Sequence, residues 1–198
     1  TFERIPALKK GWTEEFEESE GTQNFLNGQA NYPDLRGVQT NLYKCFLPRA
    51  WFNSSAIGTI AFLHPEGVYD DPNGGILRAS IYPRLRSHFQ FQNQRILFPI
   101  YHRAKFSINV YGPVLESPKF VSMANLFAVR TIDTSYEDGG SSLVSLVGGI
   151  KDEMTGDWNE LGHKDRIISV GDKELRLFAN LYDGAGTPTL EARLPALH

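Results

Sequence analysis

Six positive charges lie in a stretch of this sequence that holds no acidic residue. Between Asp71 and Glu116 there is neither aspartate nor glutamate, although the whole chain of 198 residues has a formal net charge of −3. The six side chains are those of Arg78, Arg84, Arg86, Arg95, Arg103 and Lys105. Guanidinium and ammonium groups bind phosphates, and a local cationic excess on an acidic chain is typical of a nucleic-acid surface.

Aromatic and amide side chains are interleaved with these charges. Rings can stack on bases and amides can hydrogen-bond to base edges, so the composition fits a surface that contacts both backbone and bases. These side chains are Tyr82, His88, Phe89, Gln90, Phe91, Gln92, Asn93, Gln94, Phe98 and Tyr101. The alternative is a solvated face whose charge is balanced in space by an acidic N-terminal segment. That segment contains Glu14, Glu15, Glu17, Glu18 and Glu20.

No complete catalytic constellation can be assembled from the sequence. The five histidines and the single cysteine show no metal-ligand spacing, and there is no Gly-rich phosphate loop of the common types. Ser141 and Ser142 lack the context of a nucleophile elbow and are expected in a turn. Asp70 and Asp71 could form a catalytic or metal-binding pair, but the Pro-Asn-Gly-Gly that follows favours a turn.

Composition indicates one domain of ordinary size. A length of 198 residues and an apolar share of 41% suffice for a real core. The lone cysteine, Cys45, excludes an internal disulfide framework and favours a reducing compartment. The sequence contains no apolar run of about 18 residues and no secretion signal. We therefore expect a soluble, cytoplasmic protein with no membrane partner.

The first half of the chain predicts two helices and a buried strand. An acidic helix is expected around residues 12–20. Thr40 is a good N-cap for a second helix, in which Leu42, Cys45, Phe46 and Ala50 fall on one face, and Pro48 should kink or shorten it. Residues 57–63 form a continuous apolar run, which is typical of a strand buried on both faces of a parallel sheet.

The middle of the chain predicts a second unit of helix and strands. A helix is expected over residues 76–82, and alternating apolar residues predict strands over 88–92 and 106–110. Helices between the early strands imply parallel pairing, whereas the short last connection implies an antiparallel closing strand. Asp172 can cap a last helix. We divide the chain into an N-terminal segment (1–37), an α/β part (38–112) and an extension (113–198).

Two segments in this order resemble a known family of enzymes. The helix sequence N-L-Y-K-C-F-L-P-R-A at 41–50 is followed by a strand that ends in L-H-P at 63–65. Further along, 82–93 and 105–112 look like the closing strands of the same fold. Together they resemble the carboxy-terminal part of the catalytic region of the large, type IIG-like restriction–modification methyltransferases, which methylate adenine N6 in DNA. In that family the helix follows an Asn-Pro-Pro-aromatic catalytic loop.

The resemblance implies roles for two aromatic residues. It places the ring of Phe46 against the adenine of S-adenosylmethionine, where the alternative is a core phenylalanine on an amphipathic helix. It also implies that Phe98 stacks on the target adenine after this base has been flipped out of the duplex. The spacing from Phe98 to Lys105 is longer than in the family, so Tyr101 or His102 could hold that position instead.

The resemblance also implies a fold and a limit to the activity. The expected fold is α/β, the carboxy-terminal half of a Rossmann-like methyltransferase sheet with an antiparallel closing strand, plus a smaller α+β extension that could begin a target-recognition region. The cofactor would be S-adenosylmethionine, and the partners would be double-stranded DNA and the remainder of the same polypeptide. The family's glycine loop and Asn-Pro-Pro-aromatic loop do not occur in this sequence, so we predict no methyl transfer by these 198 residues alone. The alternatives are a non-catalytic DNA-binding or specificity module and an α/β protein-interaction domain.

Overall fold

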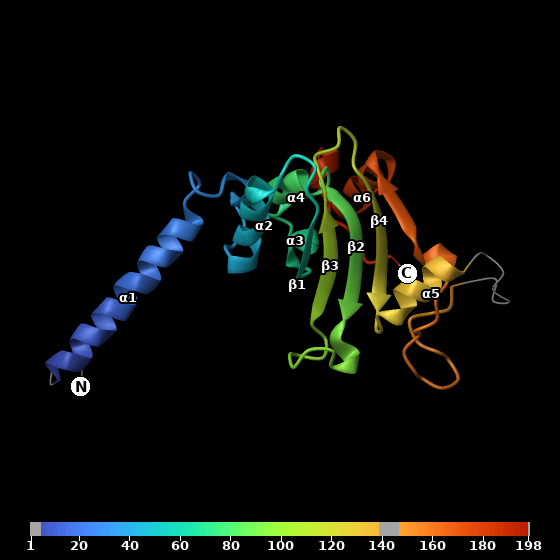
Figure 1. Ribbon diagram of the computed structural model, residues 1–198, viewed down its shortest axis with the longest axis horizontal. Helices are drawn as coiled ribbons and strands as arrows, with labels where there is room; N and C mark the ends of the chain where they lie inside the picture. Colours follow the sequence, from blue (N-terminus) through green and yellow to red (C-terminus); the bar gives the residue numbers. More distant parts are fainter. Residues whose placement is uncertain (1–4, 139–146, 198) are drawn as a thin grey trace.

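A five-stranded open sheet forms the centre of the computed structural model, which describes residues 5–138 and 147–197 (Figure 1). Its strands follow the order β1-β3-β2-β4-β5. They are β1 (Ile60–Pro65), β2 (Leu85–Gln92), β3 (Lys105–Tyr111), β4 (Lys119–Leu126) and β5 (Ile168–Gly171). Neighbouring strands are antiparallel except for the parallel pair β2 and β4. The fold is therefore mixed α/β, as the order of elements in the sequence predicts.

Six helices accompany the sheet in the described part of the chain. They are α1 (Pro6–Asn27), α2 (Leu42–Asn53), α3 (Gly67–Asp70), α4 (Gly75–Ile81), α5 (Arg130–Glu137) and α6 (Asp172–Tyr182). The helices predicted around 12–20, 76–82 and after Asp172 are thus confirmed, the first of them being much longer than predicted. Helix α1 buries none of its residues and projects away from the rest of the molecule (Figure 1).

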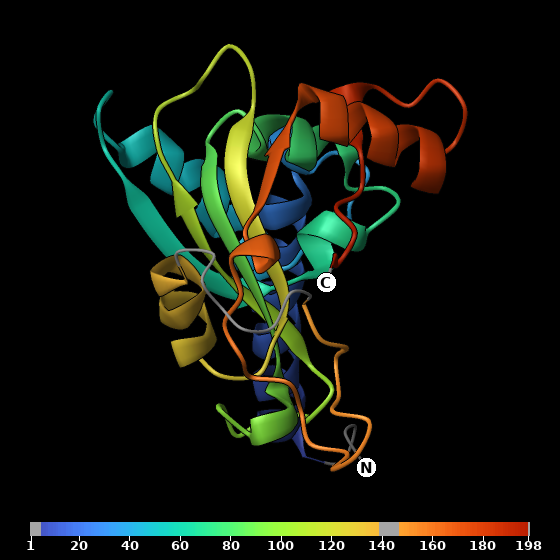
Figure 2. The same ribbon diagram turned by 90° about the vertical axis from the view of Figure 1, so that its right-hand side faces the viewer.

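The two faces of the sheet carry different cores. On one face, Leu47 of α2, Tyr69 of α3, Leu77 of α4 and Leu175 of α6 belong to a single large cluster. On the opposite face, Ile132 of α5 packs against a smaller cluster made by strand residues: Phe91, Phe106, Met123 and Leu126. Figure 2 shows α5 on one side of the sheet and α3 and α6 on the other. The alternation of apolar residues in β2 and β3 directs their phenylalanines to the smaller core.

The pairing of the first strands differs from the prediction. The antiparallel closing strand is confirmed, because β3 pairs with β2 in this way. The parallel pairing of the two early strands is wrong: β3 lies between β1 and β2, although these two strands do run in the same direction. The strand predicted over 57–63 is also not buried on both faces. It is β1 at the edge of the sheet, with Leu63 51% exposed and Ile57, before the strand, 88% exposed.

Residues beyond 112 complete the same sheet. Strand β4 lies beside β2, and β5 pairs with β4. The rings of Tyr82 and Phe120 stack at 5.7 Å across the expected boundary, and Ala192 and Leu194 belong to the larger core. Strand β4 was not predicted because both of its faces are buried, which removes the alternation that identifies a half-exposed strand.

Candidate functional site

The connection between β2 and β3 is held in a fixed shape by one buried asparagine. Asn93 is fully buried at the start of the short 3-10 helix η3 (Asn93–Arg95). Its side-chain Nδ2 donates to the carbonyls of Phe98 (2.9 Å) and Ile100 (3.1 Å), and its Oδ1 accepts from the backbone N–H of Phe98 at 3.1 Å. Its own backbone N–H donates to the carbonyl of Ala104 at 3.0 Å. These hydrogen bonds of one residue thus close the loop on itself.

Phe98 is both anchored and accessible in this loop. Its ring meets Phe106 edge to face, with centroids 5.1 Å apart, and Phe106 stacks in turn on Phe91 of the smaller core. Even so, 38% of Phe98 is exposed. The two other aromatic candidates, Tyr101 and His102, are exposed neighbours whose rings lie 4.7 Å apart. A ring that is fixed at one edge and open on another can stack on a planar ligand.

The six cations of the acid-free segment have different surroundings. Arg78 is only 1% exposed, and its guanidinium donates to the carbonyls of Val68, Asp71 and Glu191. Burial lowers its pKa from the ordinary value. Its donors are used inside the fold, which leaves no part of the guanidinium on the surface for a phosphate. Arg78 therefore cannot contact DNA, and its prediction as a DNA-binding residue is wrong.

Arg84, Arg86 and Arg95 are partly engaged. Arg84 lies over the ring of Trp51 at 4.9 Å and donates to the carbonyl of Ser80. Arg86 donates to the carbonyls of Pro83, Leu85 and Pro113. Arg95 forms an ion pair of 2.8 Å with Glu160. These side chains are used first to hold loops and turns together.

Arg103 and Lys105 are the two cations that remain available. Both are exposed, and neither has a side-chain hydrogen bond or ion pair to any residue in the ranges that the structure describes. They follow the loop that contains Phe98 and Tyr101. The predicted cationic surface therefore narrows from six side chains to two: Arg103, in the loop with the exposed rings, and Lys105, at the start of β3, where it lines a cavity with Glu66 and His88.

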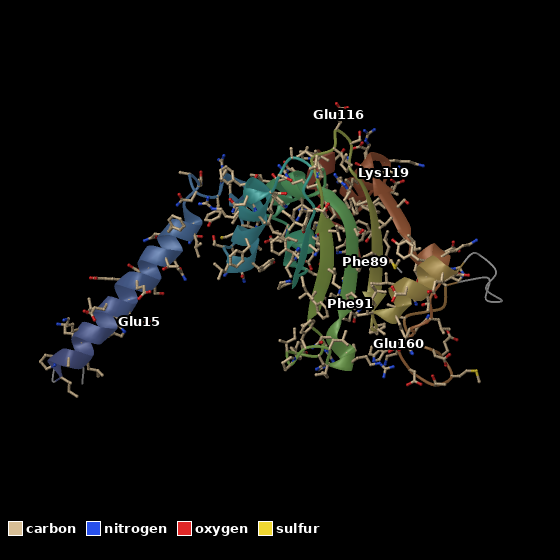
Figure 3. The ribbon with its side chains drawn as sticks, in the orientation of Figure 1. Glu15, Phe89, Phe91, Glu116, Lys119 and Glu160 are labelled. Carbon is tan, nitrogen blue, oxygen red and sulfur yellow. The ribbon has the colours of Figure 1, made fainter. Side chains whose placement is uncertain are left out.

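The acidic N-terminal helix does not neutralise this segment. Within the described ranges, the ion pair formed by the glutamates of α1 is that of Glu14 with Lys10, at 3.7 Å. Glu15, labelled in Figure 3, lies on the projecting helix, far from Phe89 and Phe91 on β2. The internal balance of charge that we considered as an alternative is therefore not made by α1.

Helix α2 presents Phe46 to the surface. The N-cap is Asn41, whose side chain accepts from the backbone N–H of Tyr43, rather than the predicted Thr40. Cys45 and Leu47 are buried in the larger core, whereas Leu42 and Phe46 are 56% and 54% exposed. The four residues expected on one face are therefore not buried together. Pro48 lies inside the helix without ending it.

Sequence reasoning missed a buried polar cluster on the face of the sheet toward α3. His88 Nε2 lies 3.1 Å from Oε1 of Glu66, and His88 Nδ1 lies 3.0 Å from the hydroxyl of Ser122. Burial raises the pKa of Glu66, but the opposing charge and hydrogen bond of His88 outweigh it, so this pKa is lowered overall. The sequence signal for this cluster is the set of polar residues that alternate with the phenylalanines of β2. Such residues are ordinarily expected to face solvent.

The same cluster continues to the sheet edge. Tyr69 donates to Oδ1 of Asn109 at 2.6 Å, and Asn109 Nδ2 lies 3.0 Å from Nε2 of His64. The hydroxyl of Tyr111 lies 3.0 Å from the same histidine nitrogen. Burial lowers the pKa of His64 and raises that of Tyr69. These groups satisfy one another, as buried polar groups must.

The Ser122, His88 and Glu66 side chains have the composition of a hydrolytic triad but not its access. A cavity of about 180 Å³ is lined by Glu66, His88, Gln90 and Lys105, and it does not reach Ser122. Ser122 is 5% exposed in the middle of β4. A nucleophile must meet its substrate, so the geometry supports a structural role for this chain of hydrogen bonds.

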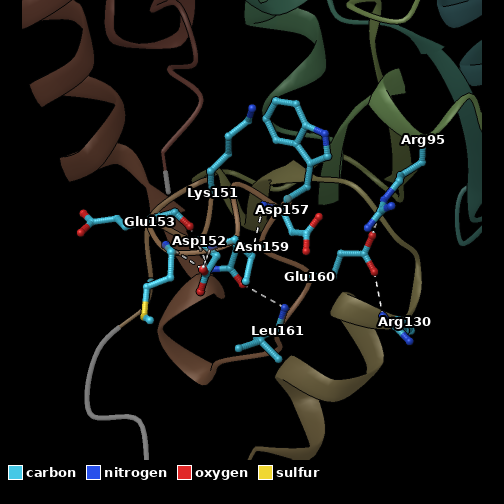
Figure 4. A pocket seen from close by; sticks show the side chains of 14 residues that line it. Arg95, Arg130, Lys151, Asp152, Glu153, Asp157, Asn159, Glu160 and Leu161 are labelled. Atoms are coloured by element: carbon cyan, nitrogen blue, oxygen red, sulfur yellow. Dashed lines mark hydrogen bonds and ion pairs between the residues drawn. The ribbon is translucent and has the colours of Figure 1, made fainter.

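A further hollow lies in the loop after the undescribed residues 139–146. Its volume is about 740 Å³, and Figure 4 shows the side chains that line it. Glu160 accepts from Arg95 at 2.8 Å and from Arg130 at 2.7 Å, and Lys151 lies 4.3 Å from the centre of the Trp158 ring. Glu160 and the two arginines therefore neutralise one another, whereas Glu153 has no side-chain partner among the described residues.

The described residues hold no group of three or more His, Cys, Asp or Glu side chains that could bind a metal ion. Ser141 and Ser142, expected in a turn, lie outside the described residues. Within the same ranges, none of the helices is both long and apolar enough to cross a membrane.

Comparison with known proteins does not assign the chain to a family. No protein-family model matches it, and a search of the curated proteins finds no match either. The function must therefore be argued from the site.

Proposed function

We propose that this chain is the carboxy-terminal half of the catalytic sheet of a DNA adenine-N6 methyltransferase of a restriction–modification or phage-defence system in the cytoplasm. Its partners would be double-stranded DNA and the part of the enzyme that holds the glycine loop and the Asn-Pro-Pro-aromatic loop. The observation that carries the proposal is the β2–β3 loop. There Phe98 is anchored on Phe106 yet 38% exposed, and Arg103 and Lys105, which follow it in the chain, have no side-chain partner among the described residues.

The order of the strands supports a Rossmann-like origin of the sheet. Strands β1 and β2 run in the same direction, and the antiparallel β3 is inserted between them. This is how a parallel sheet with helical crossovers takes up one closing strand that follows its neighbour by a short connection. Helices α3 and α4 occupy the crossover between β1 and β2.

The residues of α2 fit part of a cofactor site. S-adenosylmethionine would supply an electrophilic methyl group bound to a sulfonium. The exposed ring of Phe46 can pack on its adenine, because 54% of this residue is open to solvent while Cys45 and Leu47 anchor the helix. Phe46 would orient the cofactor and hold water away from one face of its adenine. The chain alone is expected to give no methyl transfer.

In this proposal the β2–β3 loop handles the DNA. Arg103 and Lys105 would contact phosphates and position the duplex, while the ring of Phe98 would stack on the extruded adenine. Arg95 would contribute to the potential of this surface more than to direct contacts, because it is paired with Glu160, whereas Arg84 and Arg86 lie at the other end of β2.

The test is the salt dependence of DNA binding by this chain. A fluorescent duplex of about 30 base pairs is titrated at several salt concentrations, and the affinity is expected to fall steeply as salt increases. In the double variant Arg103→Gln, Lys105→Gln, the slope of log affinity against log salt should become less steep by about 1.8, because two phosphate contacts are lost.

A matched control uses two exposed cations of α6. Lys173→Gln together with Arg176→Gln removes the same charge from the opposite end of the sheet from the β2–β3 loop (Figure 1). This variant should retain the slope of the unchanged protein. Equal losses in both double variants would mean that only net charge matters, and absence of binding at low salt would refute the DNA surface.

One observation favours a second candidate function, a protein-interaction domain. Helix α1 has 22 residues and buries none of them, and Leu8 and Phe16 on it are 50% and 45% exposed. A helix of this length gains most of its stability from packing against a partner. Helix-dependent capture of a defined protein partner, with no binding of DNA at low salt, would support this reading instead.

A further inference from the structure

The tip of the β2–β3 loop exposes a row of apolar side chains. Their exposed fractions are large for residues of this kind: Ile96 56%, Leu97 43%, Phe98 38%, Ile100 52% and Tyr101 62%. Scattered apolar residues are normal on a surface, but a contiguous group marks an interaction site. The loop stands at one end of the sheet, at the turn of the β2–β3 hairpin (Figure 1).

The tip is held rigidly in this exposed position. The side chain of Asn93 bonds to the backbone at both Phe98 and Ile100. Ile96 has a φ of 51°, in the left-handed region that β-branched residues rarely adopt. Such strain persists only where the surrounding structure enforces it, and it concentrates at functional sites. The apolar side chains are therefore presented in advance and need not be ordered when a partner binds.

The charge around the tip selects the class of partner. Arg103 follows it without a partner among the described residues, Lys105 begins β3 and lines the cavity with Glu66 and His88, and no acidic residue occurs between Asp71 and Glu116. The nearby Glu160 is neutralised by Arg95 and Arg130. An apolar tip between cations fits a polyanion that has apolar material just beneath its charged surface.

We propose that Ile100 and Tyr101 form a wedge that enters the base stack of duplex DNA where a nucleotide has left it. Side chains of this type, next to cations that hold the phosphates, insert between base steps in proteins that open or kink DNA. Phe98 is tied to Phe106 and is less able to project, whereas Ile100 and Tyr101 are more exposed than Phe98. The wedge rests on the proposed DNA-binding function and adds a separate role to it.

The wedge can be tested with a DNA duplex in which one base is already missing from the stack. Two fluorescent duplexes of about 25 base pairs are compared, identical except that one has a central abasic site. The chain should bind the abasic duplex about tenfold more tightly, because the cost of removing a base from the stack has already been met. In Ile100→Ser, Tyr101→Ala this preference should fall to about onefold, with unchanged affinity for the paired duplex.

A control substitution removes an exposed ring elsewhere. Phe52 on α2 is 81% exposed, and Phe52→Ala should keep the full preference for the abasic duplex. Urea unfolding of each variant verifies that it is folded, which is expected because all three side chains are exposed.

The outcomes separate the wedge from the DNA surface itself. Equal binding of both duplexes would overturn the wedge and leave the proposed DNA surface intact. Binding of neither duplex at low salt would overturn both. Binding that depends on Tyr101 to vesicles of phosphatidylserine and phosphatidylcholine, without preference for the abasic duplex, would assign the tip to a lipid surface and also overturn the wedge.

Discussion

Two neighbouring loops of this protein contain the same kinds of residue and use them in opposite ways. In the loop between β2 and β3, the rings of Phe98 and Tyr101 are exposed and Arg103 has no side-chain partner among the described residues, nor has Lys105 at the start of β3. In the loop at 148–161, Glu160 binds two arginines and Lys151 lies over Trp158. The first loop leaves Arg103 available to a ligand, although its Arg95 is paired with Glu160, whereas the second loop uses Lys151, Asp152 and Glu160 in contacts that hold its fold.

The contrast shows what sequence composition leaves undecided about a cationic segment. A charge can serve a binding surface only if its partners are absent from the fold, and this depends on residues far away along the chain. Arg95 illustrates the point, because the residue that engages it is Glu160, 65 positions further on. Counting the charges of one segment cannot reveal such a pair, because the partner residue lies in another segment. The three-dimensional structure does reveal it.

The largest effect is expected from the asparagine that shapes the first loop. Asn93→Ala should lower the free energy of unfolding by about 2 kcal/mol, because it removes a fully buried side chain and leaves the partly buried N–H of Phe98 and the carbonyls of Phe98 and Ile100 without this partner. It should also weaken the preference for the abasic duplex, since the tip is no longer held. Urea unfolding and duplex binding measure the two effects.

The matched variant in the second loop is Asn159→Ala. Asn159 also bonds to backbone on both sides, donating to Gly149 and accepting from Leu161, but these hydrogen bonds are exposed, whereas those of Asn93 are partly buried. Water can replace its hydrogen bonds, so the loss should stay below about 1 kcal/mol. Similar losses in the two variants would show that Asn93 does not determine the shape of its loop.

Much of the fold could be predicted from the sequence, and the failures have physical causes. Strands β2 and β3 were predictable because Phe89, Phe91, Phe106 and Ile108 alternate with polar residues. The burial of those polar residues was not, because His88 and Asn109 are satisfied by partners from other elements. Likewise, the apolar run of β1 predicts a strand inside a parallel sheet. The run is equally compatible with an edge strand, because it contains no information on whether another strand pairs beyond it.

The candidate site was predictable in kind and not in detail. The acid-free segment indicated a cationic surface, but nothing local distinguishes the buried Arg78 from the exposed Arg103. That difference arises because Arg78 lies on α4 against the carbonyl of Glu191, which is 113 residues away. The roles of Phe46 and Phe98 remain predictions, and the structure contributes their exposure.

A smaller effect is expected when the second loop is made more like the first, by freeing the arginines that Glu160 binds. Glu160→Gln removes the charge that neutralises Arg95 and Arg130, and the affinity for duplex DNA at about 0.1 M salt should rise about threefold. Glu153→Gln is the matched control, because it removes an exposed carboxylate from the same loop that has no partner among the described residues. Equal gains in the two variants would show that net charge, and not release of the arginines, sets the affinity.

The smallest effect concerns stability and its dependence on pH. Burial raises the pKa of Glu160, but hydrogen bonds from Arg130 and Arg95 outweigh it and lower this pKa below the ordinary value of 4.5. A carboxyl group whose pKa is lowered by folding stabilises the protein above its unfolded value, and this contribution is lost as pH falls through the folded value. Both arginines are largely exposed, so Glu160→Gln should cost at most about 1 kcal/mol at pH 7. Urea unfolding of the two proteins from pH 7 to pH 3.5 should show this difference shrinking below about pH 4.5. A difference that stays constant over that range would mean that the ion pairs contribute nothing and that the second loop is held by its hydrogen bonds alone.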